Sequence, residues 1–129
     1  MFLKYFSVKK YVSLEFPEKI RKIGSRYSVE GYHIDGRVLY KILEPLTDRQ
    51  IDKLKERLST HLKKVGYENP IDRSPLFCIP SIKKCFSVIV GSEHISIYPP
   101  EEKYYLSERD LPEFKNFLKE IEKVLQEFP

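Results

Sequence analysis

Apolar and polar residues alternate along the first sixteen positions of the chain. The even positions from Phe2 to Phe16 are mostly apolar, whereas the odd positions are mostly polar or tyrosine. This period of two predicts β structure with one buried face, which Pro17 ends. The segment from Pro17 to Gly24 has proline at its start and glycine at its end, and this order predicts one or two helical turns.

Two β-hairpins are predicted farther along the chain. The pair Asp35-Gly36 separates two β-rich runs, residues 27–34 and 37–43. Asp-Gly suits a type I′ turn, in which both central residues have positive φ. A second hairpin is predicted from residues 85–90 and 94–98, with its turn at Gly91-Ser92-Glu93.

Two longer segments have the helical period instead. Thr47 and Gln50 have the spacing of a capping box, and Gly66 is a natural helix end. The apolar stripe of this helix consists of Ile51, Leu54, Leu58, Leu62 and Val65. A second helix is predicted to begin between Ser107 and Pro112. Its apolar face consists of Phe114, Phe117, Leu118, Ile121, Val124, Leu125 and Phe128.

Together these elements predict a single α+β domain over residues 1–129. We expect an antiparallel sheet built from hairpins, with two long amphipathic helices packed on one face. The parts are a basic β-rich N-terminal part (1–45), a helix (46–66), a proline-containing loop (67–83), and a hairpin with the C-terminal helix (84–129). The loop is expected to hold at most a short strand around Leu76–Cys78.

Composition excludes several classes of protein. With 41% hydrophobic and 33% charged residues, the chain is not disordered. No apolar run approaches the ~18 residues of a membrane span, and early lysines interrupt any secretory signal. We therefore expect an intracellular, cytoplasmic protein with no membrane partner. The chain has no alanine and is rich in lysine and glutamate, which favours an AT-rich, thermophilic archaeal or viral source.

Positive charge is concentrated in the first half of the chain. Residues 1–64 hold 15 Lys/Arg and 8 Asp/Glu, a net of +7, whereas the whole chain has a net charge of +4. This asymmetry predicts an acidic partner. The predicted nucleic-acid-binding residues are cations for phosphate and tyrosines for base stacking: Lys4, Lys9, Lys10, Arg21, Lys22, Arg26, Tyr27 and Tyr32. The alternative interpretation is that these tyrosines pack the sheet.

The leading hypothesis is a small non-enzymatic binding protein that contacts nucleic acid through its basic N-terminal half. The alternative is a homodimeric protein-interaction or viral accessory module, in which the basic half of one copy meets the acidic half of another. A molecular mass in solution that depends on protein concentration distinguishes the homodimer hypothesis. Salt-dependent binding of nucleic acid distinguishes the first hypothesis.

A third hypothesis is enzymatic. His33-Ile34-Asp35 and His94-Ile95-Ser96 fall in the two predicted hairpins. Paired strands of this kind resemble the active site of two-histidine phosphoesterases, and the resemblance implies phosphodiester cleavage by His33 and His94. In that family a hydroxyl residue occupies the position of Asp35.

The remaining candidates for chemistry are the two cysteines. The spacing of Cys78, Cys85 and His94 matches no zinc template. We therefore expect no metal, no cofactor and no assigned catalytic residue. Two buried free thiols are the favoured interpretation of the cysteines, with a disulfide as the alternative.

Overall fold

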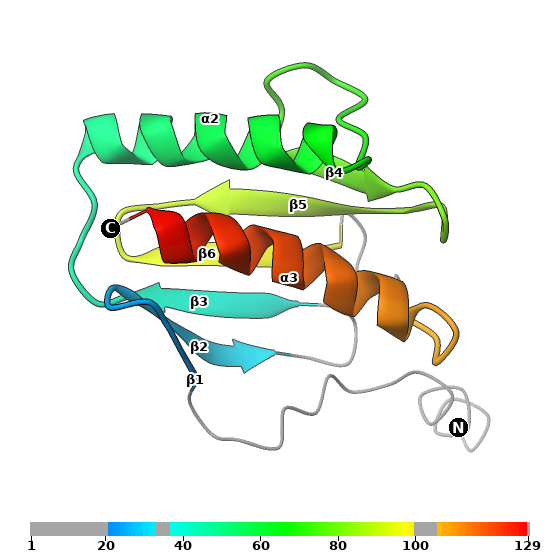
Figure 1. The fold of residues 1–129 in the computed structure, drawn as a ribbon, viewed down its shortest axis with the longest axis horizontal. Helices are drawn as coiled ribbons and strands as arrows, with labels where there is room; N and C mark the ends of the chain where they lie inside the picture. The colour runs from blue at the N-terminus through cyan, green and yellow to red at the C-terminus, as the bar shows by residue number, and fades with distance from the viewer. Residues whose placement is uncertain (1–20, 33–36, 100–105, 129) are drawn as a thin grey trace, which may run out of the picture.

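The computed structural model describes residues 21–32, 37–99 and 106–128. Within them, three strands followed by a helix occur twice in chain order (Figure 1). The first unit contains β1 (Arg21–Ile23), β2 (Tyr27–Tyr32), β3 (Val38–Ile42) and α2 (Asp48–Lys64). The second contains β4 (Leu76–Ile79), β5 (Lys84–Val90), β6 (His94–Tyr98) and α3 (Leu111–Glu127). None of the helices in these described ranges is long and apolar enough to cross a membrane.

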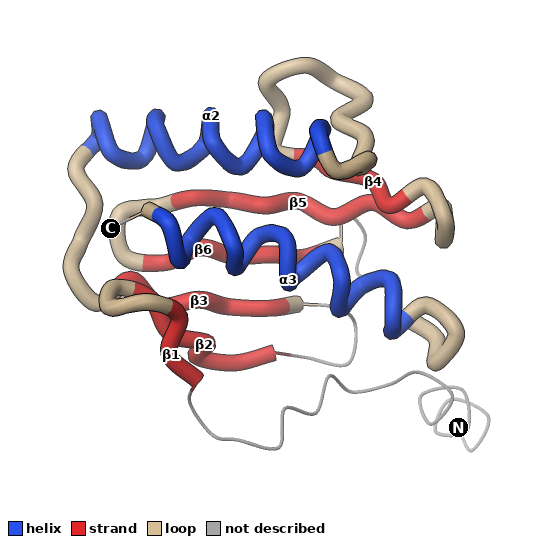
Figure 2. The backbone as a smooth tube through the Cα atoms, viewed as in Figure 1, coloured by secondary structure: helices blue, strands red, loops and turns tan. Residues whose placement is uncertain are grey.

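All six strands belong to one antiparallel sheet, which confirms the predicted α+β class. The strand order is β1-β2-β3-β6-β5-β4 (Figure 2). The third strand of each unit therefore lies at the centre, where Val38 pairs with Ile97 and Tyr40 with Ile95. Both predicted hairpins are present as β2–β3 and β5–β6. The predicted turn at Asp35-Gly36 and the predicted strands before Pro17 lie outside the described residues.

One set of alternating strand residues forms the core. Strand residues that are at most 6% exposed are Ile23, Tyr27, Val29, Val38, Tyr40, Ile42, Phe77, Ile79, Phe86, Val88, Val90, Ile95 and Ile97; Ser28 is also buried. The apolar residues of this set form one cluster with Leu54, Leu58 and Leu62 of α2 and the apolar stripe of α3. Helix α2 contacts α3 and β5, while α3 also contacts β1 and β4. In Figure 1, α3 crosses in front of the central strands.

Both helix starts are set by local chemistry. The Thr47 side chain accepts a hydrogen bond from the Gln50 N–H at 3.2 Å, and the Gln50 side chain accepts from the Thr47 N–H at 2.9 Å. This reciprocal pair confirms the predicted capping box of α2. Helix α3 begins after Asp110, inside the predicted window, and has Pro112 in its first turn.

The helical turns predicted for Pro17–Gly24 are wrong over the described part of that segment. Arg21–Ile23 instead form β1, which pairs with β2 through Arg21–Val29 and Ile23–Tyr27. Ile23 is buried beside Tyr27, so burial against the sheet outweighs the weak helical signal. Gly24 has a φ of 63°, a value that glycine adopts readily, and it starts the turn into β2.

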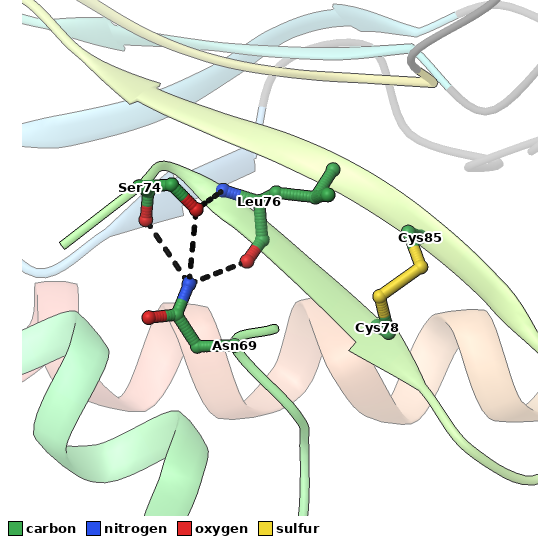
Figure 3. Close-up of a disulfide and its surroundings, with 5 residues drawn as sticks. All are labelled: Asn69, Ser74, Leu76, Cys78 and Cys85. Atoms are coloured by element: carbon green, nitrogen blue, oxygen red, sulfur yellow. Dashed lines mark hydrogen bonds between the residues drawn. A yellow bond between two sulfur atoms is a disulfide. The ribbon is translucent and has the colours of Figure 1, made fainter. Parts of the chain in front are cut away.

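The favoured interpretation of two free thiols is also wrong, because Cys78 and Cys85 form a disulfide (Figure 3). The two residues pair directly across β4 and β5, with their Cα atoms 3.9 Å apart. Cys78 exchanges both of its backbone hydrogen bonds with Glu68 on its other side, at 3.0 and 2.7 Å. It therefore belongs to a pair without hydrogen bonds to β5, the type in which side chains approach most closely.

An ion pair joins the start of α3 to the sheet. The Lys84 ammonium, at the start of β5, contacts the Asp110 carboxylate, and both side chains are largely buried. Burial raises the pKa of Asp110. Hydrogen bonds from Lys84 and from the Ser107 N–H, together with the Lys84 charge, outweigh this effect and hold the pKa below its usual value.

We predict that Asp110→Asn destabilises the fold at pH 7 by about 2 kcal/mol, the value of a hydrogen bond to a charged group. Because the folded-state pKa of Asp110 is depressed, its stabilisation is present above the unfolded pKa of about 4 and disappears as pH falls through the folded value. Urea denaturation should therefore show a difference between wild type and variant that shrinks from pH 7 toward about pH 2. Glu108→Gln, at an exposed neighbour, is the control, and an equal shrinkage there contradicts the assignment.

Candidate functional site

The strand residues between the buried ones form a second surface, which we call the outer face. Its described members include Lys22, Glu30, Leu39, Lys41, Ser87, Ile89, His94, Ser96 and Tyr98. Tyr98 is 41% exposed and Ile89 is 36% exposed. Large side chains at this level of exposure on neighbouring strands give the outer face apolar contact area as well as charge.

Cations and an aromatic ring lie along the two central strands of the outer face. Tyr98 directly follows Ile97, whose partner Val38 directly follows the exposed Arg37. Arg37 and Tyr98 therefore flank the same end of the β3–β6 pair. At the other end Lys41 pairs with His94. The two ends are four residue steps apart along a strand, which corresponds to about 14 Å at about 3.4 Å per residue.

One carboxylate also lies on the outer face. Glu30 Oε2 is 3.5 Å from His94 Nε2, so this glutamate reaches across from β2 toward β6. Both side chains are 45% exposed, and an exposed pair of this kind contributes little to stability. Glu30 therefore lowers the positive potential at the Lys41 end of the outer face.

Of the predicted cations, the structure describes the side chains of Lys22 and Arg26. Lys22 is exposed on the outer face. The guanidinium of Arg26 donates to the backbone oxygens of Glu44 at 2.9 Å and Pro45 at 3.1 Å. Arg26 therefore ties the β1–β2 turn to the segment before α2, so its donors are already used within the fold.

The ring of Tyr27 cannot stack on a base, because it is completely buried in the core. It shares a face with Val29 and pairs with Ile23 and Ile42. Burial raises the pKa of Tyr27, and the nearby Arg26 charge opposes this only in part. Lys4, Lys9 and Lys10 lie outside the described residues. Arg21 and Tyr32 lie on β1 and β2, but their side chains are not described.

The histidines do not form a described catalytic pair. His33 lies outside the described residues, and His94 contacts Glu30. The His61 ring is 2.8 Å from Glu120, which joins α2 to α3. That hydrogen bond is the main cause that holds the pKa of Glu120 below its usual value. Within the described ranges, no group of three or more His, Cys, Asp or Glu residues could hold a metal ion.

The chain matches no protein-family model, no curated protein and no solved structure. The sequence-based site omitted Arg37, Lys41 and Tyr98. The signal for Tyr98 was available, since it alternates with the apolar Ile97 and Ile95 and must lie on the opposite face.

The two buried tyrosines give a matched test of these assignments. Tyr27 Oη has no hydrogen-bond partner among the described residues, whereas Tyr40 Oη donates to Glu122 Oε2 at 2.9 Å. We predict that Tyr27→Phe leaves stability unchanged or raises it by up to about 1 kcal/mol, because a desolvated hydroxyl is removed. Tyr40→Phe should cost about 1–3 kcal/mol. Urea denaturation of both variants checks this, and a larger loss for Tyr27→Phe contradicts it.

Proposed function

We propose that this protein is a non-enzymatic binding protein that holds single-stranded nucleic acid on the outer face of its sheet. The proposal includes the arrangement of the two long helices. We infer that α2 and α3 both cover the face that carries the buried strand residues. No described element then covers the outer face, and a flexible strand of nucleic acid can lie across it.

The observation that carries the proposal is the position of Tyr98 on a central strand, beside the exposed Arg37 and on the same face as Lys41. An exposed tyrosine ring offers a stacking platform for a base of any sequence. Arg37 beside it and Lys41 about 14 Å away along β3 can contact two different phosphates of the same strand of nucleic acid. Lys22 extends this positive charge toward the β1 edge. The basic N-terminal half thus supplies the cations, as the sequence hypothesis expects, while the ring comes from the second half.

Single strands are favoured over duplex by the shape of this surface. A sheet face is flat and offers no helix or ribbon that could enter a major groove. Stacking on Tyr98 also requires a base that is not already stacked within a duplex. Glu30 repels phosphate at one end, so we expect moderate affinity with strong dependence on salt.

We predict that fluorescence anisotropy with labelled oligo-dT and oligo-U detects binding that weakens as salt rises from about 50 to 300 mM. Tyr98→Ala should weaken binding by about 5- to 150-fold, since one stacked base contributes about 1–3 kcal/mol. Lys41→Gln should lower the slope of log affinity against log salt by about 0.7, the contribution of one phosphate contact in a single strand. The matched control Lys119→Gln changes an exposed lysine on α3 and should leave the slope unchanged.

Absence of binding at the lowest salt, or full binding by Tyr98→Ala, contradicts the proposal. Sedimentation equilibrium separates it from the alternative of a homodimeric interaction module. A wild-type dimer that Tyr98→Ala converts to monomer assigns the outer face to a subunit interface instead of nucleic acid.

A further inference from the structure

A groove of about 570 Å³ lies beside α2, at the end of the sheet where β4 stops pairing with β5. One wall comes from α2, the other from the loop before β4, and the floor from β4 and β5. The residues that line the groove include Lys55, Ser59, Lys63, Arg73, Val88 and Val90. This volume falls within the usual range for ligand sites.

The floor of the groove includes backbone groups of β5 that have no strand partner among the residues that the structure describes. The Gly91 N–H donates to the His94 oxygen at 2.8 Å, which makes these two residues a hydrogen-bonded pair of the β5–β6 hairpin. Antiparallel pairs alternate, so the next pair, Val90–Ile95, is without hydrogen bonds. The N–H and C=O of Val90 therefore point away from β6, toward the groove. No described backbone hydrogen bond outside the strand ladders uses them.

Two residues of the loop explain why β4 leaves this edge unpaired. The Val88 N–H donates to the Pro75 oxygen at 2.8 Å, but proline has no N–H to return to the Val88 C=O. Two residues earlier, where a longer β4 would face Val90, Arg73 has a φ of 66°. That left-handed conformation is incompatible with a strand. The edge of β5 thus presents the Val88 C=O and both backbone groups of Val90.

The two walls of the groove combine positively charged side chains with a serine hydroxyl. Lys55, Ser59 and Lys63 follow one another at four-residue intervals, so they form one stripe along α2. Arg73 adds a cation from the loop. Lys63 contacts Asp72 at 3.4 Å, and Glu56 also lines the groove. After these two carboxylates, the three cations leave the groove with a net positive charge.

The loop wall is held in place before any ligand arrives (Figure 3). The Asn69 side-chain amide donates to the backbone oxygens of Ser74 at 3.1 Å and Leu76 at 2.6 Å. The Ser74 hydroxyl accepts from the Leu76 N–H at 3.3 Å. The disulfide then fixes β4 to β5 two residues beyond Leu76. A preorganised wall lowers the entropic cost of binding.

We infer that the groove binds an extended, acidic segment of a partner protein, which adds a short strand to the free edge of β5. The partner residue opposite Val90 accepts from the Val90 N–H and donates to its C=O. Its side chain lies on the same face as Val90, toward α2, because directly paired residues share a face. A carboxylate at that position reaches the positively charged stripe of α2. The site is separate from the outer-face cations of the proposed function.

The probe for this inference is a capped, fluorescein-labelled pentapeptide with glutamate at its centre, valine on either side and threonine at both ends. We expect it to bind, to shift the Val90 amide signal in NMR spectra, and to slow hydrogen exchange at the Val90 N–H. The same peptide with central lysine should bind at least about tenfold more weakly. Methylation of the central peptide nitrogen should abolish binding, since it removes the donor to the Val90 C=O.

Matched variants of the full chain place the peptide in the groove. Lys55→Glu should weaken binding of the glutamate peptide at least about tenfold. Lys53→Glu makes the same charge change at an exposed position of α2 that does not line the groove, and it should change binding less than about twofold. Ser59→Trp fills the groove and should prevent binding, with circular dichroism confirming that the variant is folded.

Several results overturn the inference. They are no binding of the glutamate peptide at about 1 mM, equal binding of the N-methylated or lysine peptide, and equal effects of Lys53→Glu and Lys55→Glu. A different result assigns the groove to a second copy of this chain: a molecular mass in solution that rises with protein concentration, together with slow hydrogen exchange at the Val90 N–H in the absence of peptide. The outer-face proposal is unaffected by any of these outcomes, because the Tyr98 variants test it separately.

Discussion

The pairing of β3 with β6 is the interaction on which the rest of this structure depends. The described residues form two units of three strands and a helix, and this central pair joins the two units into one sheet. Its register sets which residues enter the core, since a slip by one position moves a whole strand's side chains to the other face. The same register places Arg37 and Tyr98 at one end of the outer face and Lys41 at the other.

The two units of three strands and a helix resemble each other in sequence at one point. Tyr27-Ser28-Val29 lies in β2 and Phe86-Ser87-Val88 in β5, the middle strand of each unit. Tyr27 and Phe86 are both fully buried. The halves differ where sites are built. Pro75 and Arg73 cut short the pairing of β4 with β5, so within the described ranges the backbone groups of Val90 next to α2 have no strand partner.

Local signals made most of the fold predictable. The capping box at Thr47 and the periodicity of both helices depend on residues within a turn of one another, and both hairpins depend on alternation beside a turn. The disulfide was not predictable, because two cysteines separated along the chain do not reveal register; only the Cys78–Cys85 pairing brings them together. The predicted site failed at Tyr27 for a related reason. Charge and aromatic content along the chain do not show which face a side chain occupies, whereas Tyr27, two residues from Val29, shares its buried face.

The two proposed sites meet at Ile89. This residue belongs to the outer face and also lines the groove, where it lies between Val88 and Val90. A strand added to this edge of β5 places every second side chain on the outer face, the face that Ile89 shares. A bound segment therefore widens the surface that we assign to nucleic acid, and its outward side chains become part of that surface. Acidic residues at those outward positions oppose phosphate, whereas an acidic residue that points toward α2 does not, because the backbone of the sheet separates it from the outer face.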